Sequence, residues 1–103
     1  MKIYRHGDVL LKECALPEEK NVLKESNEVT IALGEATGHH HTLYGSVPIG
    51  LFEFDDRRYL QIQEEVELRH QEHHMLKIEP GNYEVIIERE YDYFEETMKK
   101  VVD

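Results

Sequence analysis

Histidine is the residue type in this chain whose spacing could do chemistry, and most of its histidines fall into two short clusters. In the first, "GHHHT", His39 and His41 stand two positions apart. On a strand such residues project to one face, with Cα atoms about 6.6 Å apart at a rise of about 3.3 Å per residue. Two imidazoles so placed can bind one ion at Zn–N distances of about 2.0–2.1 Å. We therefore expect His39 and His41 to be metal ligands, with His40 pointing the other way.

The second cluster, "RHQEHHM", follows about thirty positions later. His70 shares the strand phase of Val66 and Leu68, so we expect it to point inward. The alternation fails after His70, which indicates a turn, and across a turn His70 and His73 can meet. His74 takes the place of His73 if the chain stays extended. We expect the two clusters to converge on one metal site.

Two glutamates flank the clusters, Glu35 before the first and Glu72 within the second. Each could be a ligand, an acceptor that orients an imidazole N–H, or a general base beside a metal-bound water. Glu72 is our candidate catalytic acid or base, with Glu35 as the alternative. Ligands of this kind suit a divalent transition metal; zinc is the first expectation, and Fe, Mn, Ni and Cu stay open. His6, beside Gly7, is expected to be a turn residue rather than a ligand.

The composition sets limits on the class of protein. A chain of 103 residues predicts one domain, 1–103, and its 40% hydrophobic content fits a globular fold. A net charge of −10 disfavours nucleic acid and anionic membranes as partners. We find no apolar run long enough for a membrane span and no signal peptide, which places the protein in the cytoplasm. Cys14, the only cysteine, excludes a disulfide within the chain and a cysteine-based zinc site.

The elements that must position the histidines are mainly strands, because the dominant hydrophobic period is two. We expect strands at 8–13 and 28–34, a loop at 16–27, and a strand through residues 42–45 that is broken at 46–50. Residues 51–63 predict a hairpin with Asp55 and Asp56 at its tip. Residues 75–90 predict a second hairpin-like pair turning at 80–82.

The C-terminal segment predicts a short helix. Asp92 can cap it, and apolar residues recur at helical spacing from Phe94 to Val102. Seven or eight short strands without alternating helices indicate a small barrel or sandwich. The expected fold is therefore all-β with a short C-terminal α-helix.

A glycine before an H-x-H pair, followed by strands and a Pro-Gly turn, is similar to the cupins. Their metal sits in a small β-barrel on a His-x-His pair, a glutamate and a further histidine. This chain has residues 43–46 (LYGS) where cupins place the glutamate, and Tyr83, Val85 and Ile86 where they place the last histidine. The similarity implies the barrel fold and does not transfer the ligands.

The chain more closely resembles a group of small uncharacterised prokaryotic proteins that share the motifs G-E-x-T-G-H-x-H, H-x-E-H, P-G-x-Y-x-V and R-E-Y. Here these read at residues 34–41, 70–73, 80–85 and 89–91. The resemblance covers nearly the whole chain and implies no activity. The site residues that it implies are His39, His41, His70 and His73, with Glu35 and Glu72.

Three functions remain open at this point. A metalloenzyme, either a hydrolase or an oxygenase, would keep an open metal position for water or oxygen. A non-catalytic module would close its site with histidines, so that the metal holds the fold. A metal-free interaction or regulatory module would use the histidines as a solvated or pH-responsive surface. Beyond a metal ion, the sequence leaves a small-molecule substrate, a protein partner and the oligomeric state undecided.

Overall fold

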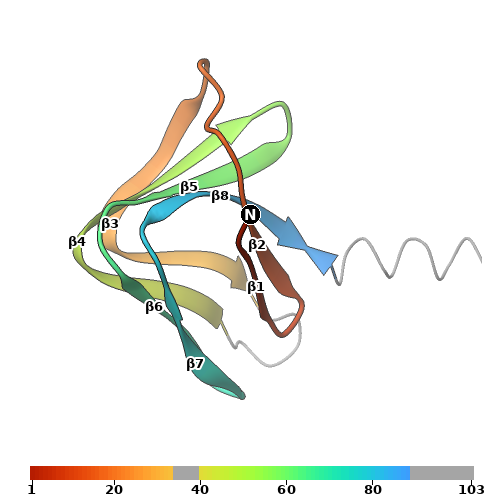
Figure 1. The fold of residues 1–103 in the computed structure, drawn as a ribbon, viewed down its shortest axis with the longest axis vertical. Helices are drawn as coiled ribbons and strands as arrows, with labels where there is room; N and C mark the ends of the chain where they lie inside the picture. The colour runs from red at the N-terminus through yellow and green to blue at the C-terminus, as the bar shows by residue number, and fades with distance from the viewer. Residues whose placement is uncertain (34–39, 89–103) are drawn as a thin grey trace, which may run out of the picture.

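The computed structural model describes residues 1–33 and 40–88, and this part of the chain is almost entirely β-strand. Here eight strands form one antiparallel sheet that curls into a nearly closed barrel (Figure 1). Hydrogen-bonded neighbours follow the order β1-β2-β8-β5-β4-β6-β7, and β3 pairs with β4. The expected all-β class is confirmed. The strands are β1 (Ile3–His6), β2 (Val9–Glu13), β3 (Asn21–Leu33), β4 (His40–Phe54), β5 (Arg57–Ile62), β6 (Val66–His70), β7 (His73–Ile78) and β8 (Gly81–Ile87).

Tight turns join β1 to β2, β4 to β5 and β6 to β7, and their residues suit the backbone. Gly7 opens the two-residue loop after β1 with a φ of 63°, which glycine adopts without steric cost. Asp55 and Asp56 have φ values of 53° and 62°, and two positive values are typical of a type I′ turn. The predicted tip of this hairpin is confirmed. His70 and His73 pair across the β6–β7 turn.

Strand β4 continues through residues 46–50, where the sequence analysis expected a break. Its first part pairs with β6 and its second part with β5, so the strand turns a corner of the barrel between them. The β3–β4 ladder shifts register near Asn27, whose side-chain amide donates to the Gly45 carbonyl at 3.1 Å. Pro48 has no N–H, and this irregular stretch of the ladder tolerates it.

Two other expectations about the strands are wrong, and one strand was not expected. Strands β7 and β8 follow one another across residues 79–80 but do not pair; β7 pairs with β6, while β8 lies between β2 and β5. Strand β3 begins at Asn21, inside the segment expected to be a loop, because its exposed polar half needs no apolar alternation. Strand β1, which the sequence analysis did not expect, pairs with β2.

One apolar core fills the barrel, and it carries the site at one end. Val9, Leu11, Leu43 and Leu68 are completely buried. Because strand side chains alternate between faces, His41 continues the inward phase of Leu43. It is 3% exposed, so the core ends on a histidine.

The barrel is closed along one line by side chains. We call this line, where β1 faces β7, the seam; it lies between the first and last strands of the sheet order (Figure 1). The Glu79 amide donates to the Tyr4 hydroxyl at 3.2 Å, and Lys2 pairs with the Glu79 carboxylate at 2.5 Å. His6 reaches the carbonyl of His74 at 2.7 Å.

Within residues 1–33 and 40–88, no helix has the length and apolar character needed to cross a bilayer. The C-terminal helix predicted from Asp92 lies outside the described residues.

Candidate metal centre

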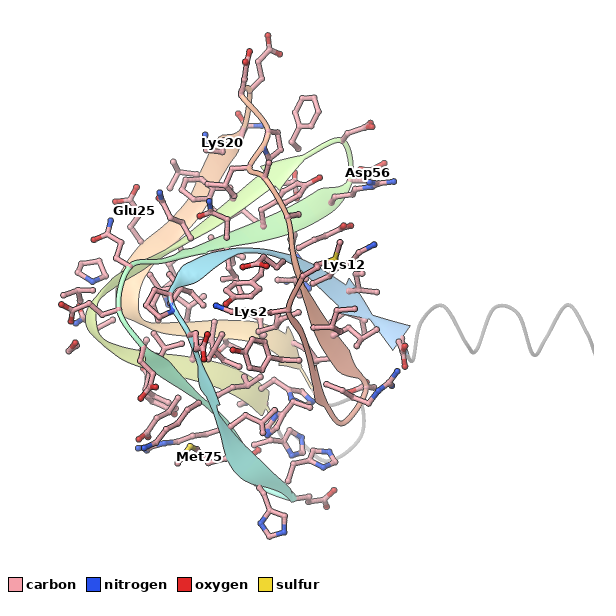
Figure 2. The ribbon with its side chains drawn as sticks, in the orientation of Figure 1. Lys2, Lys12, Lys20, Glu25, Asp56 and Met75 are labelled. Atoms are coloured by element: carbon pink, nitrogen blue, oxygen red, sulfur yellow. The ribbon has the colours of Figure 1, made fainter. Side chains whose placement is uncertain are left out.

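Three histidine side chains from three strands meet at one end of the seam. His41 lies near the start of β4, His70 ends β6 and His73 begins β7. One ring nitrogen from each lies within 4.8 Å of those chosen from the other two. The ring centroids are 4.3 Å apart for His41 and His70, and 4.6 Å apart for His70 and His73. We call these residues the histidine triad. Figure 2 shows imidazole rings gathered beside the β1–β2 turn and β7.

The local structure explains how each ring is placed. The β6–β7 turn pairs His70 with His73, and a register shift after Leu68 turns the end of β6. The backbone N–H of Glu72 donates to His70 Nδ1 at 3.0 Å. Exposure rises across the triad, because His41 is buried, His70 is half-buried and His73 is exposed. The triad therefore spans from the core to solvent.

A fourth histidine, His6, lies against the triad from the other side of the seam. It is 3% exposed, and its ring centroid is 5.1 Å from that of His41 and 5.4 Å from that of His73. Its Nδ1 is 3.0 Å from His41 Nδ1, while its Nε2 contacts the His74 carbonyl. The sequence analysis expected only a turn residue here. A histidine before a Gly-Asp turn gives no local sign of burial.

Asp8 adds a carboxylate to the cluster. Its Oδ1 lies 3.2 Å from His41 Nε2, so both ring nitrogens of His41 have polar neighbours. Burial, followed by the nearby His70 and His6, lowers the pKa of His41 from 6.5 to about 4, although Asp8 acts in the opposite direction. Burial is also the main cause that lowers the pKa of His6. Both rings are therefore neutral at pH 7, the form that can bind a metal.

The backbone of Gly7 lies directly against the ring of His73. A Cβ placed on Gly7 would be 2.5 Å from His73 Nε2, and the φ of 63° also favours glycine. The sequence predicted a turn here but gave no sign that the turn supports a ring of the cluster.

The triad contains three of the four predicted ligands. The fourth, His39, lies outside the described residues, as does the candidate base Glu35. The side chain of Glu72, the other candidate acid or base, is exposed, and its backbone N–H contacts the ring of His70. The side chain of His74, the alternative ligand, is exposed.

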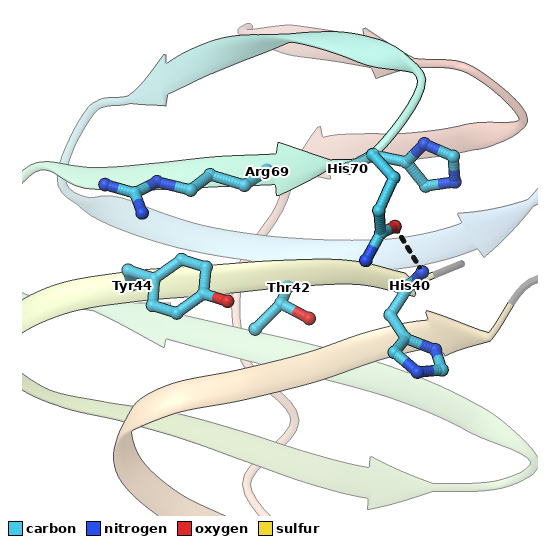
Figure 3. A pocket seen from close by; sticks show the side chains of 6 residues that line it. His40, Thr42, Tyr44, Arg69 and His70 are labelled. Carbon is cyan, nitrogen blue, oxygen red and sulfur yellow. Dashed lines mark hydrogen bonds between the residues drawn. The ribbon is translucent and has the colours of Figure 1, made fainter. Parts of the chain in front are cut away.

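A polar pocket of about 230 Å³ lies beside the triad along β4 and β6 (Figure 3). The Arg69 guanidinium lies 4.7 Å from the centre of the Tyr44 ring and is paired with Glu67 at 2.5 Å. Its charge is thus already matched by a carboxylate. Gln71 accepts the backbone N–H of His40 at 2.9 Å, tying the β6–β7 turn to β4. The remaining lining residues are Thr42 and His70.

The chain was compared with known families and proteins. Residues 5–88 match the model of a family described as domain of unknown function DUF8820. The chain belongs to this family. The DUF8820 match spans both sides of the seam, from the His6 turn to the histidine triad. Comparisons with curated proteins and with solved structures found no match.

Proposed function

We propose that this domain binds one divalent transition-metal ion through His41, His70 and His73. The observation that carries the proposal is the convergence of three ring nitrogens, from β4, β6 and β7, to within 4.8 Å of one another. Neutral imidazoles are ligands for Zn, Fe, Ni and Cu, and Mn accepts them beside oxygen. Zinc is the first expectation.

The spacing is close to that of a bound site. Ligand atoms around tetrahedral zinc are about 3.3 Å apart, from bond lengths of about 2.0–2.1 Å. Small side-chain rotations close the remaining gap. His73 is exposed and His70 half-buried, so these two rings are less confined than that of buried His41.

Metal content tests the proposal directly. We expect untagged protein, dialysed after loading with Zn²⁺ and assayed by elemental analysis, to hold about one ion per chain. His70→Ala should lose most of it, because two nitrogens remain from the triad. The matched control is His74→Ala, since His74 is an exposed histidine on the same turn and its side chain lies outside the triad.

Two outcomes would reject the proposal. One is wild-type protein that holds no stoichiometric metal after loading with Zn, Fe, Mn, Ni or Cu. The other is equal loss in His70→Ala and His74→Ala, which would indicate non-specific binding to exposed imidazoles. Far-ultraviolet circular dichroism checks that both variants keep the β-fold.

Activation of a metal-bound water is a second candidate function, favoured by the exposure of His73. A metal at the triad would face solvent on that side, where a water ligand can bind and lose a proton. Glu72, on the same turn, is the candidate to move that proton, with Glu35 as the alternative. Such a site would support hydrolysis, or oxygen chemistry if the bound metal is iron. The cytoplasmic location and the absence of nucleic-acid and membrane partners stay predictions from the sequence.

A further inference from the structure

The β1–β2 turn brings two residues to the histidine triad that the sequence did not assign as ligands. Asp8 Oδ1 lies 3.2 Å from His41 Nε2, and His6 Nδ1 lies 3.0 Å from His41 Nδ1. We propose that Asp8 is a fourth metal ligand and that His6 is a positioning residue, which fixes the nitrogen of His41 that carries the proton. This inference rests on the proposed function.

The donors and acceptors in the contacts of His6 and His41 can be assigned from the backbone carbonyl that His6 contacts. The His74 carbonyl can only accept, so His6 Nε2 is the donor in the 2.7 Å contact. Neutral His6 then presents a lone pair at Nδ1. The 3.0 Å contact between the two Nδ1 atoms therefore needs the proton on His41 Nδ1. A neutral His41 held in this way directs the lone pair of Nε2 away from His6.

In this tautomer the lone pair faces the carboxylate oxygen of Asp8, 3.2 Å away. A cation bound by both atoms would make this contact favourable. The separation matches the spacing of about 3.3 Å between two ligand atoms on one tetrahedral metal. His41 and Asp8 are thus spaced as neighbouring ligands.

The arrangement also has the outer contacts typical of metal sites. A ligating histidine usually donates its other ring N–H to an acceptor that sets its orientation. Here the acceptor is His6, which is buried, 3% exposed, and anchored to the backbone of β7. Three nitrogens and one carboxylate oxygen would complete tetrahedral zinc, whereas a six-coordinate metal would keep two positions for other ligands.

The variant Asp8→Asn tests the ligand role by two opposite effects. At pH 8, we expect affinity for Zn²⁺, measured by competition with a chelating dye, to fall at least tenfold. The melting temperature of the metal-free protein should stay the same or rise, because the Asn amide can donate to His41 Nε2. Unchanged affinity would overturn the assignment. Weaker affinity with a lower metal-free melting temperature would also overturn it, since Asp8 would then act by holding the turn.

The role of His6 is tested by a rescue. Gln carries a donor and an acceptor about as far apart as the two ring nitrogens, so His6→Gln can keep both hydrogen bonds. We expect its Zn²⁺ affinity to stay within about threefold of wild type, while His6→Leu loses about 10–100-fold. Equal loss in both variants would make His6 a ligand itself, and no loss in either would remove its role; both results overturn the inference.

The Gln variant and Asp8→Asn keep the test decisive if His6→Leu does not fold. Wild-type protein that binds no metal would reject the proposed function itself. If wild-type protein binds metal and Asp8→Asn binds it with the same affinity, only the further inference is rejected. The two failures are therefore distinguishable.

Discussion

At the scale of single residues, Gly7 shows how a position without a side chain shapes the candidate site. The turn backbone approaches the His73 ring so closely that an added Cβ would lie 2.5 Å from Nε2. The φ of 63° adds strain of about 1–2 kcal/mol for any residue with a Cβ. Gly7 thus serves both the turn and the placement of a proposed ligand.

We expect Gly7→Ala to lower the free energy of unfolding by at least about 1 kcal/mol, through the backbone strain alone. We also expect it to weaken Zn²⁺ binding, because the methyl group displaces His73. Urea unfolding and competition titration measure the two effects. Gly81→Ala is the control, since Gly81 also has positive φ and its nearest contact is Tyr83 rather than the triad. Equal affinity in both variants would show that Gly7 serves the turn only.

The predictability of the site differs from residue to residue. Strand phase and the break after His70 were enough to place His41, His70 and His73 on one site, because both signals are local. The presence of His6 and Asp8 in the cluster could not be predicted from the sequence. His6 and Asp8 join the cluster only because the sheet curls until β1 faces β7, and no period in the sequence encodes which strands meet at a seam.

At the scale of elements, the errors in the predicted strands have the same cause: the local sequence does not encode which strands pair. The type I′ hairpin at residues 55–56 was predictable, since turn chemistry and alternation sit together in one segment. The lack of pairing between β7 and β8 was not predictable. A turn sequence at residues 80–82 is the same whether the next strand pairs with the strand before the turn or with a different strand. β4 was expected to end before Pro48, yet the bulged ladder of β3 lets the strand continue.

The seam gives the elements a mechanical role in the proposed site. A metal held by the triad and Asp8 would join the β1–β2 turn to the β6–β7 turn across the seam, where hydrogen bonds made by side chains link β1 to β7 and the residue after it. We therefore expect zinc to slow amide hydrogen exchange at residues 70–73, which can open locally in the metal-free protein. Residues 54–57, at the β4–β5 turn, are the internal control.

Hydrogen exchange read by mass spectrometry separates this effect from general stabilisation. Slower exchange at both turns by the same factor would indicate that the metal acts only on global unfolding. Faster exchange at residues 70–73 would mean that the metal binds elsewhere and loosens the turn, and would contradict the bridging role.

At the scale of the whole molecule, the charge of the chain favours a cation. Its 22 acidic residues against 12 basic ones produce a negative field that raises the local concentration of divalent ions. This field is screened by salt and gives no selectivity. In the proposed site, preference for a metal over protons would come from the buried end of the triad, where His41 is 3% exposed and its pKa is lowered to about 4. Protons therefore compete little with a metal for this ring at neutral pH.

The core decides what happens when the metal is removed. Among the described strands, all except β1 supply completely buried core residues, and this apolar packing does not depend on an ion. They include Leu11, Val29, Leu43, Leu60, Leu68, Ile78 and Tyr83. A ligand that binds only the folded state stabilises it by about 2.7 kcal/mol at a hundred times its Kd. In a domain of this size, 1 kcal/mol shifts the Tm by about 4–8 °C.

We therefore expect chelation of zinc-loaded protein to lower the Tm by about 10–20 °C while the far-ultraviolet circular dichroism at 25 °C keeps its β signature. A differential scan with and without a chelator measures both. The metal-free state should also unfold in one cooperative transition, because the core is continuous from β2 to β8 and through β6. Loss of the β signature on chelation would instead assign the metal to folding, and would favour the metal-stabilised module over a site with exchangeable metal.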